Sequence, residues 1–251
     1  MTGSLLLVPA PLDLGAEETA LEDVLPRGVI RRAAALGHWV AEDARSARAL
    51  LKRMHAIEPL ALPLQAIRID ELPRPRKGSR EPVPAGAWHA LLKPALDGHD
   101  LGLVSEAGLP AVADPGAALV EAAHRAGVPV QPLAGASALL LALAASGLNG
   151  QSFAFVGYLP QEAAARAARV RELEAVSRRC GQTQLMIETP YRNAALLDGL
   201  LATLAPATRL SVSCGLTLAG GWTRTDAVAD WRTRPARMPD RWPAVFALLA
   251  A

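Results

Sequence analysis

Short runs of branched and leucine-rich residues, bounded by glycine and proline, alternate along the chain with longer stretches of helical spacing. This alternation is typical of α/β layering, and in the first half it predicts a mostly parallel sheet. We expect strands there at residues 5–8, 101–105 and 128–132. Near Gly135 to Ser137 the pattern changes to strands followed by long helices, with strands at 152–158, 184–188, 209–214 and 244–249. We therefore predict two α/β domains, residues 1–134 and 135–251.

Capping residues place the helices between these strands. Asp114 can cap a helix that has Pro115 at its first position and that ends at Gly127. A second helix is expected from Ser137 to Gly147; because its middle is apolar on every face, we expect it to lie buried between layers. Further helices are predicted at residues 44–57, 162–179 and 193–204, the second solvated and the third amphipathic.

Two segments outside these elements have a distinctive composition. Pro9 and Pro11 follow the first strand, and since proline neither donates to a ladder nor continues a helix, the chain must turn there. That carboxyl edge is where open α/β sheets bind ligands. Residues 68–86 hold four prolines among charged residues, which predicts an exposed, mobile loop. This loop could be a solvated linker, a lid or a contact for RNA phosphates.

Overall composition narrows the class of protein. A content of 51% hydrophobic and 20% charged residues supplies a buried core. Cys180 and Cys214 match no metal or redox spacing and are expected to be reduced thiols, and the five histidines fall at no ligand spacing, so we expect no metal site. A net charge of +2 does not by itself identify a nucleic-acid binder.

No segment is expected to interact with a membrane. The longest apolar stretch, residues 138–145, is far shorter than the roughly 20 residues of a spanning helix. The first residues carry no basic leader, so we expect a soluble, cytoplasmic protein.

One turn stands out as a candidate for chemistry. Ser105-Glu106-Ala107-Gly108-Leu109-Pro110 follows a predicted strand, and Ala113-Asp114-Pro115-Gly116 comes soon after it. Small residues at the carboxyl end of a strand let backbone N–H and C=O groups approach a ligand closely. Dinucleotide-binding, Walker and nucleophile-elbow motifs do not occur in the sequence. From these residues alone, a strand–turn–helix junction and a ligand site both remain open.

Several short motifs, taken in order, resemble a known family over nearly the whole chain. They are Val8-Pro9-Ala10-Pro11, Ala41-Glu42-Asp43-Ala44-Arg45, Ser105 to Pro110, Asp114-Pro115-Gly116, Pro132 to Ala138, Gly157-Tyr158-Leu159-Pro160 and Glu188-Thr189-Pro190-Tyr191-Arg192. Their order resembles the ribosomal RNA small-subunit (cytidine) 2′-O-methyltransferase branch of the tetrapyrrole methylase superfamily.

The resemblance implies two α/β domains with S-adenosyl-L-methionine in the cleft between them, usually in a homodimer. It also implies ribosomal RNA as the partner and the ribose 2′-hydroxyl as the methyl acceptor. The residues that it places beside the cofactor are Pro11, Leu12, Ala107, Gly108, Leu109, Ser137, Ala138, Ile187, Glu188, Cys214 and Gly215. Most of them would act through backbone atoms and apolar walls.

Four charged residues near the predicted turns are candidates for catalysis, although none is assigned as the base. They are Glu42, Asp43, Arg45 and Glu106. Glu42 and Asp43 also precede a predicted helix, where negative charge is favourable in any protein. Glu188 follows a buried strand and needs a partner, either Arg192 or the cofactor.

The last 30 residues and several motif positions leave alternatives open. Trp222, Trp231 and Trp242 lie among arginines, and they could stack on RNA or pack in the core or a dimer contact. Polar residues of the family pattern are replaced at Ala44, Gly215, Leu218 and Pro243, whereas the small-residue turns are kept. Methylation of a tetrapyrrole or another small molecule is therefore an alternative, as is a non-catalytic paralogue that binds S-adenosylmethionine.

Overall fold

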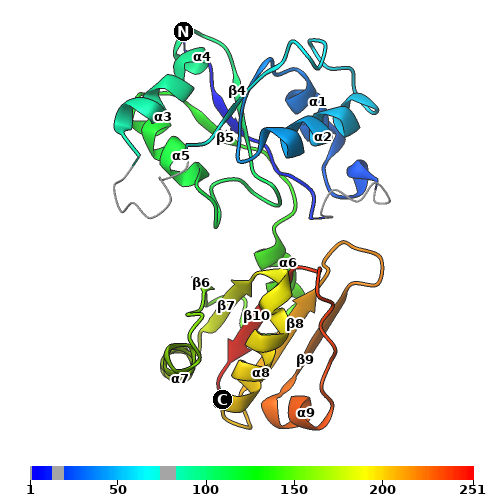
Figure 1. The fold of residues 1–251 in the computed structure, drawn as a ribbon, viewed down its shortest axis with the longest axis vertical. Helices are drawn as coiled ribbons and strands as arrows, with labels where there is room; N and C mark the ends of the chain where they lie inside the picture. The colour runs from blue at the N-terminus through cyan, green and yellow to red at the C-terminus, as the bar shows by residue number, and fades with distance from the viewer. Residues whose placement is uncertain (1, 13–19, 74–82) are drawn as a thin grey trace. The chain divides into compact units, whose positions relative to one another are not determined.

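The computed structural model describes residues 2–12, 20–73 and 83–251, and the chain divides into two compact units, Met1–Ser137 and Ala138–Ala251 (Figure 1). Each unit contains one five-stranded sheet with helices on both faces, which confirms the predicted α/β class. The division falls between Ser137 and Ala138, whereas the sequence predicts it between residues 134 and 135.

The N-terminal unit is built on a sheet with the strand order β3-β2-β4-β1-β5, in which every hydrogen-bonded pair is parallel. This confirms the mostly parallel sheet expected from the sequence. Its strands are β1 Leu5–Leu7, β2 His38–Ala41, β3 Arg68–Glu71, β4 Leu101–Val104 and β5 Val130–Pro132.

Helices cover both faces of this sheet. On one face lie the 3-10 helix η1 Leu21–Asp23 and helices α1 Arg27–Ala34 and α2 Ala44–His55; on the other lie α3 Ala85–Leu91, α4 Lys93–Leu96 and α5 Gly116–Arg125 (Figure 1). Successive strand residues point to opposite faces. Leu6 accordingly joins the core beneath α1 and α2, and Leu5 joins the core beneath the other helices.

The sequence reading missed β2 and β3. In β2, Trp39 is paired with Gly102, and a Cβ at Gly102 would lie only 2.7 Å from the indole ring, so the ring lies directly on the glycine backbone. Strand β3 occupies the start of the segment 68–86, where a loop is predicted, so that prediction is wrong for Arg68–Glu71. Its charged sequence is typical of an edge strand, which gives no alternating apolar signal. Residues 74–82 of the predicted loop lie outside the described residues.

The C-terminal unit contains a mixed sheet with the order β6-β7-β10-β8-β9. Strands β6 and β7 are parallel, and the remaining pairs are antiparallel. The strands are β6 Phe153–Tyr158, β7 Thr183–Glu188, β8 Arg209–Cys214, β9 Trp222–Ala227 and β10 Ala244–Leu249; the helices are α6 Ala138–Ser146, α7 Ala163–Cys180, η2 Pro190–Arg192, α8 Asn193–Thr203 and α9 Val228–Thr233. Helices α7, α8 and α9 share the core on one face, and α6 packs on the other.

Helix α6 is not buried on all sides, contrary to the prediction. Ala142 and Leu143 are buried, but Leu140 is 53% exposed and Leu141 is 40% exposed. Within its own unit α6 contacts strands β8, β9 and β10, so only one side of the helix is covered by this sheet. An apolar sequence on every face therefore does not indicate how many layers surround a helix.

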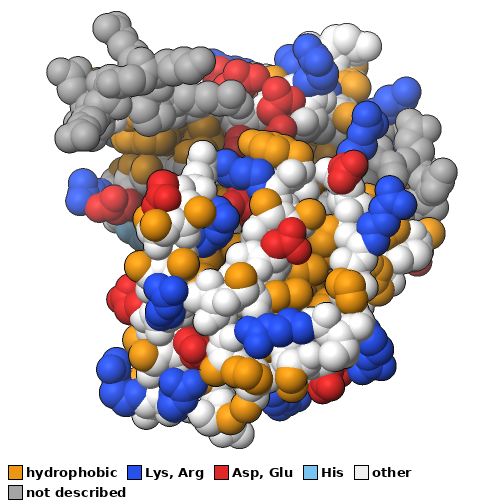
Figure 2. All heavy atoms as spheres, turned by 60° about the horizontal axis from the view of Figure 1, so that its bottom comes forward, with side chains coloured by type: hydrophobic (Ala, Val, Ile, Leu, Met, Phe, Trp, Pro, Cys, Tyr) orange, Lys and Arg blue, Asp and Glu red, His pale blue; other side chains and the backbone are white. Residues whose placement is uncertain are grey.

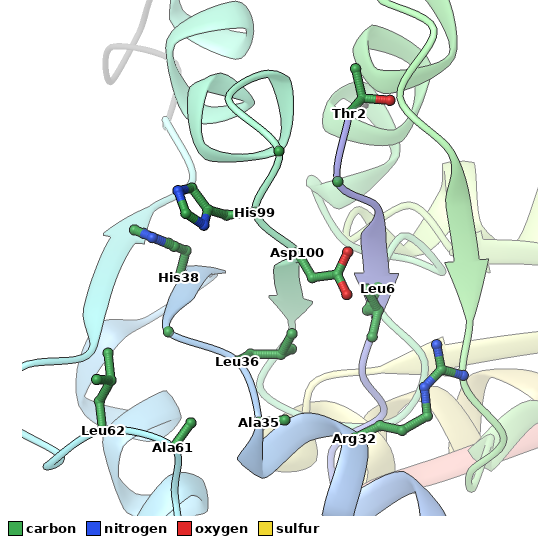
Figure 3. Close-up of a pocket in the computed structure, with 13 residues that line it drawn as sticks. Thr2, Leu6, Arg32, Ala35, Leu36, His38, Ala61, Leu62, His99 and Asp100 are labelled. Carbon is green, nitrogen blue, oxygen red and sulfur yellow. The ribbon is translucent and has the colours of Figure 1, made fainter.

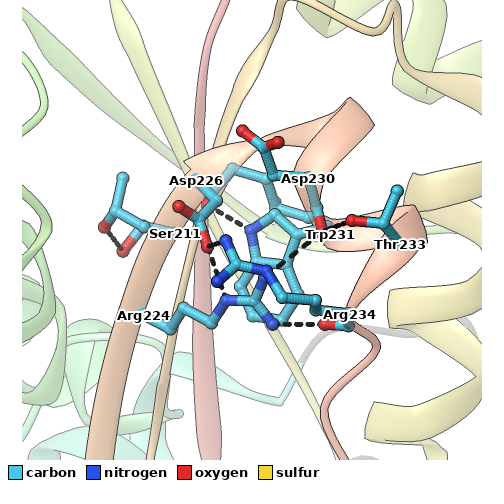
Figure 4. Close-up of polar contacts among 9 residues, drawn as sticks. Ser211, Arg224, Asp226, Asp230, Trp231, Thr233 and Arg234 are labelled. Carbon is cyan, nitrogen blue, oxygen red and sulfur yellow. Dashed lines mark hydrogen bonds and ion pairs between the residues drawn. The ribbon is translucent and has the colours of Figure 1, made fainter.

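The tryptophan and arginine residues near the end of the chain have separate environments. Trp231 is fully buried, and its indole N–H donates to the carbonyl oxygen of Leu210 at 2.8 Å, so it packs in the core and is no platform for RNA bases. The Arg224 guanidinium stacks 4.0 Å from the Trp231 ring and binds Asp226 at 2.6 Å (Figure 4). Arg224 and Asp226 both belong to the edge strand β9, which the sequence reading missed, and Arg224 attaches α9 to this strand through its contact with Trp231.

Among the described residues, no helix is both long and apolar enough to cross a membrane.

Candidate functional site

Loops that follow the parallel strands meet at the carboxyl edge of the N-terminal sheet. The loop after β1 and the loop after β4 are joined by two backbone hydrogen bonds: Ala10 N–H donates to Gly108 O at 2.9 Å, and Gly108 N–H donates to Ala10 O at 3.0 Å. The loop after β5 reaches the same point, since a Cβ at Gly108 would lie 3.8 Å from the carbonyl oxygen of Ala136 and 3.6 Å from Leu12 Cδ2. Three segments far apart in the sequence thus surround Gly108.

Gly135 shows how closely these loops approach one another. A Cβ at this position would lie 2.3 Å from Pro9 Cγ, a distance that no side chain tolerates. Pro9, Ala10, Pro11 and Leu12 are all buried. The prolines and the glycine of the predicted turns are therefore required for packing at this edge.

The turn after β4 is held open by its own hydrogen bonds. Gly108 has φ of 71°, and the Ser105 hydroxyl donates to the carbonyl oxygen of Ala107 at 3.2 Å. Ala107 is exposed and Leu109 is half-buried. Ala107 at the tip of the turn is therefore accessible to a ligand, whereas Gly108 is buried and bonds Ala10 with both of its backbone groups.

Asp114 supports the next part of this loop. Ala111 and Ala113 both adopt left-handed conformations, with φ of 67° and 64°, which are costly for residues with a Cβ. One carboxylate oxygen of Asp114, Oδ1, accepts from Ala111 N–H at 2.9 Å and from Gly116 N–H at 2.7 Å. Asp114 therefore binds the first N–H of α5, as expected of a capping side chain, but the helix begins at Gly116 with Pro115 as its N-cap, one residue later than predicted.

The second carboxylate oxygen of Asp114 is a feature that the sequence reading missed. Oδ2 is buried, and it has no hydrogen-bond partner among the described residues. Burial raises the pKa of Asp114 above the usual value of 3.8. A desolvated carboxylate with an unused acceptor is a common feature of binding sites, and no sequence signal separates it from an ordinary helix cap.

The four catalytic candidates occupy different environments at this edge. Glu106 N–H donates to Glu42 Oε2 at 3.4 Å, so these two residues lie together. Asp43 caps α2: its carboxylate accepts from the backbone N–H of Ser46 at 2.7 Å and from the Ser46 hydroxyl at 2.9 Å, and these bonds lower its pKa. Arg45 is exposed in the first turn of α2. A carboxylate of lowered pKa is a weak base, so Asp43 is poorly suited to proton transfer.

The candidates in the C-terminal unit meet at one end of its sheet. Ala244 at the start of β10 is paired with Glu188 of β7 on one side and with Cys214 of β8 on the other. Neighbouring strands lie about 4.8 Å apart, so the backbones of Glu188 and Cys214 are roughly 10 Å from each other. Ile187 faces the opposite side and joins the hydrophobic cluster that contains Ala138 at the start of α6. Ser137, the preceding residue, is half-buried.

Two of these side chains are already paired or buried within the C-terminal unit. Glu188 Oε1 accepts from Arg192 at 2.7 Å, which confirms one of the two pairings expected for this glutamate. The Cys214 side chain is fully buried, and burial raises the pKa of its thiol. Because that thiol belongs to the core beneath α7 and α8, Cys214 can reach a ligand only through its backbone.

The backbone of Gly215 lies against the ring of Trp242. Its φ is 65°, and a Cβ there would lie 2.5 Å from the Trp242 ring. Gly215 N–H donates to Pro243 O at 2.9 Å, and the buried Asn193 amide donates to Trp242 O at 2.9 Å. Gly215, a departure from the family pattern, is therefore in direct contact with Trp242.

A polar hollow of about 710 Å³ lies at the opposite, amino edge of the N-terminal sheet (Figure 3). The rings of His38 and His99 are 5.4 Å apart on one side of it, and Arg32 lies on another. Asp100 accepts from Ser4 N–H at 2.8 Å. None of the predicted site residues lines this hollow, so it is separate from the candidate site.

Among the described residues, no group of three or more histidine, cysteine, aspartate or glutamate side chains is placed to hold a metal ion.

No family model matches the chain. Over 202 residues it is 32% identical to the ribosomal RNA small subunit methyltransferase I of Halalkalibacterium halodurans, a match that covers 80% of this chain and 61% of that relative. Over 108 residues it is 44% identical to the protein of the same name from Micromonospora olivasterospora, covering 43% of this chain and 33% of the relative. The matches thus span less than two thirds of the length of these curated relatives.

The fold also has solved counterparts. The structure of uroporphyrin-III C-methyl transferase from Thermus thermophilus complexed with S-adenyl homocysteine aligns with a TM-score of 0.52, at 17% identity, over 98% of this chain and 97% of that one. At that identity the likeness shows the fold, whereas the relatives above share sequence. The chain therefore shares the two-domain fold of the tetrapyrrole methylases, and in sequence it resembles the ribosomal RNA small subunit methyltransferase I proteins.

Proposed function

We propose that this chain is an S-adenosylmethionine-dependent methyltransferase whose acceptor is a ribose 2′-hydroxyl of ribosomal RNA. The observation that carries the proposal is the meeting of three loops around Gly108 at the carboxyl edge of a parallel sheet, in a chain whose curated relatives are named for ribosomal RNA methylation. Sheets of this kind bind nucleotide-like ligands at that edge.

The residues of the N-terminal unit fit the cofactor in shape and chemistry. A nucleoside with an amino-acid tail needs apolar walls and a few fixed polar groups. Pro11, Leu12 and Leu109 provide the walls, and the exposed backbone of Ala107 lies beside them. The N–H and C=O of Gly108 are bonded to Ala10 and hold the first two loops together. The free Oδ2 of Asp114 lies in the same loop and can accept a hydrogen bond after a small rearrangement.

The C-terminal unit contributes a second set of candidates to the proposal. Ala138 and Ile187 offer apolar surface, and Cys214 and Gly215 offer backbone groups. Ser137, the last residue of the N-terminal unit, offers a small side chain directly before Ala138. Glu188 is held by Arg192 and can act as a fixed acceptor.

The chemistry needs little from the protein beyond alignment. The sulfonium of S-adenosylmethionine supplies an electrophilic methyl group: its S–CH₃ bond breaks as the hydroxyl oxygen forms an O–CH₃ bond, which leaves S-adenosylhomocysteine. Holding the acceptor in line accounts for much of the acceleration. The hydroxyl proton must be removed, and we assign Glu42 and Glu106, which lie together at this edge, as the carboxylates positioned to accept it.

The proposal includes a cytoplasmic location and a homodimer, as the family resemblance implies. Size-exclusion chromatography with light scattering will test the dimer, and a mass of one chain would contradict it.

The test of the proposed function is methyl transfer. Purified protein is incubated with S-adenosylmethionine carrying an isotopic methyl group and with small-subunit RNA that lacks its ribose methylations. We expect label in a 2′-O-methylated nucleoside after digestion, and less label with Glu106→Gln. Binding of the cofactor without label in RNA would contradict the proposed acceptor.

A smaller acceptor is the alternative, and one observation favours it. Charged and polar positions of the family pattern are replaced by Ala44, Gly215, Leu218 and Pro243, which removes groups that could hold an RNA sugar or phosphate. The same assay with a tetrapyrrole in place of RNA distinguishes the two acceptors. Failure to bind the cofactor at all would leave only a non-catalytic role.

A further inference from the structure

Helices α1 and α2 have an unusual charge composition. Helix α1 carries Arg27, Arg31 and Arg32, and α2 carries Arg45, Arg48, Lys52 and Arg53, while neither helix contains an aspartate or a glutamate. Like charges three or four residues apart on a helix repel one another and destabilise it. Arg27 and Arg31, Arg45 and Arg48, and Arg48 and Lys52 are all spaced in this way. Stability alone does not favour such a sequence.

These cations lie on the outer side of the helices. The buried residues of α1 and α2 form the core with the sheet. We use the name α1–α2 basic surface for the exposed cations Arg27, Arg31, Arg32, Arg45, Arg48 and Lys52. The two helices pack against each other on the same face of the sheet (Figure 1), so we consider their exposed cations together.

Carboxylates offset only part of this charge. Glu58 binds Arg27 at 3.0 Å and lies 4.0 Å from Arg31, and Asp43 lies near Arg45. Glu22 also acts on Arg27. Arg32, Arg48 and Lys52 form no ion pair with any other described residue. An excess of positive charge therefore remains toward the middle and the carboxyl end of α2.

The helices on the other face of the same sheet are balanced. Lys93 pairs with Asp97 at 2.8 Å, and Arg125 pairs with Glu121. On the face of the molecule drawn in Figure 2, basic and acidic side chains are likewise interspersed. Within the N-terminal unit, the excess of cations is thus concentrated on α1 and α2, which a net charge of +2 for the whole chain conceals. In the other unit, helix α7 also carries more arginine than glutamate.

We infer that the α1–α2 basic surface binds the phosphate backbone of the RNA substrate; this inference rests on the proposed function. Exposed arginine and lysine side chains along a helix are the usual contacts to phosphate, and arginine suits it by geometry. Helix α2 begins at Ala44, directly after Glu42 and Asp43 at the carboxyl edge. Its 12 residues extend for about 18 Å, so RNA bound along it leads to that edge.

The experiment compares two double variants of the full chain. In Arg48→Gln/Lys52→Gln, two unpaired cations of the basic surface are removed. In Lys93→Gln/Arg125→Gln, the same charge is removed from the opposite face. Binding of a fluorescently labelled fragment of small-subunit ribosomal RNA is measured by anisotropy at several KCl concentrations, without cofactor. S-Adenosylhomocysteine binding and thermal unfolding are measured on the same proteins.

We expect the first variant to bind RNA about tenfold more weakly near 0.15 M salt. Its plot of log K against log salt should be shallower by about 1.5, since each lost phosphate contact removes about 0.7 to 0.9 from the slope. Its melting temperature should stay the same or rise, because a like-charge repulsion is removed. The control variant should keep the wild-type slope.

Several outcomes would overturn the inference: equal loss of slope in both variants, no loss in either, or no RNA binding by the wild type. Equally tight, Arg48- and Lys52-dependent binding to phosphatidylserine vesicles would point to a lipid surface instead. Failure of the proposed function is distinguishable, because it appears as absence of S-adenosylhomocysteine binding while the RNA-binding results are unaffected.

Discussion

In the carboxylate of Asp114, one oxygen accepts two hydrogen bonds and the other accepts none from the described residues. Oδ1 holds two backbone N–H groups, and Oδ2 is buried without a partner among the described residues. A buried acceptor without a partner is unfavourable. Such an atom is retained where a ligand completes its hydrogen bonding, which fits the position of Asp114 beside the turn at Gly108.

The raised pKa of Asp114 gives a pH prediction. The folded protein holds this proton more tightly than the unfolded chain, so its stability falls as pH rises from the usual aspartate value of 3.8 toward the folded-state pKa. Asp114→Asn keeps one oxygen for both N–H groups and removes this dependence. We therefore expect the stability of the variant relative to the wild type to increase over that pH range and then level off. Denaturant unfolding at several pH values measures it; a constant difference would contradict the assignment.

We predict that substitution of Asp43 lowers stability, whereas substitution of Glu106 lowers the rate of methyl transfer. Asp43→Ala removes the cap of α2, so we expect a melting temperature lower by roughly 3 °C, with Asp43→Asn close to the wild type because asparagine also caps. Glu106 is exposed, so Glu106→Gln should leave the melting temperature unchanged and lower the rate of methyl transfer at least about tenfold. Thermal unfolding and a transfer assay separate the two roles. The account is wrong about Glu106 if its variant transfers methyl groups at the wild-type rate.

At the scale of elements, the loops of the N-terminal edge depend on positions without a side chain. Gly135→Ala places a Cβ 2.3 Å from Pro9, so the loop after β5 must move. We expect a destabilisation of about 1–3 kcal/mol and weaker S-adenosylhomocysteine binding. Gly28→Ala is the matched control: nothing lies within 4 Å of its Cβ, and alanine favours the helix by roughly 0.5–1 kcal/mol. Equal behaviour of the two variants would contradict close packing at this edge.

Gly215 and Trp242 are predicted to be coupled. Gly215 replaces a polar residue of the family pattern, and the Trp242 ring occupies the space that a side chain at position 215 would need. Gly215→Ala should destabilise the wild type by about 1–3 kcal/mol more than it destabilises Trp242→Gly, because the ring that it would strike is then absent. A double-mutant cycle of unfolding free energies measures this difference. Additive effects would mean that the contact carries no energy.

Most strands, the edge strands β5 and β6 among them, could be predicted from sequence, whereas β2, β3 and β9 could not. The predicted segments 209–214 and 244–249 coincide with β8 and β10, whose residues are almost all buried. Edge strands β3 and β9 are polar, since one side faces solvent, and β2 was missed because its short apolar run is followed at once by Glu42 and Asp43. Periodicity reports burial, so elements with little burial give no signal.

The candidate site was predictable only in part. Small-residue turns at strand ends indicated the backbone around Gly108, and the sequence correctly indicated Asp114 as a cap. The unused oxygen of Asp114, the buried orientation of Cys214 and the contact between Gly215 and Trp242 all depend on residues distant in the chain. No local pattern specifies such contacts.

At the scale of the whole molecule, the predicted site residues are divided between two units whose sheets differ in topology. The N-terminal sheet is parallel and presents its loops at one edge, whereas the C-terminal sheet is mixed and brings the ends of β7 and β8 together at the start of β10. Shared sequence with curated relatives extends over 80% of the chain in one match, so it includes motifs of both units. We therefore propose that both units serve the same function, the methyl transfer described above.

Cofactor binding is the claim on which the rest depends, and calorimetric titration of the full chain with S-adenosylhomocysteine tests it most directly. We expect one site per chain with a dissociation constant on the order of micromolar, as is usual for a small ligand of this size. Gly135→Ala should weaken it, and Gly28→Ala should not. The absence of any binding heat from well-folded protein at millimolar ligand, at two temperatures, would contradict the account.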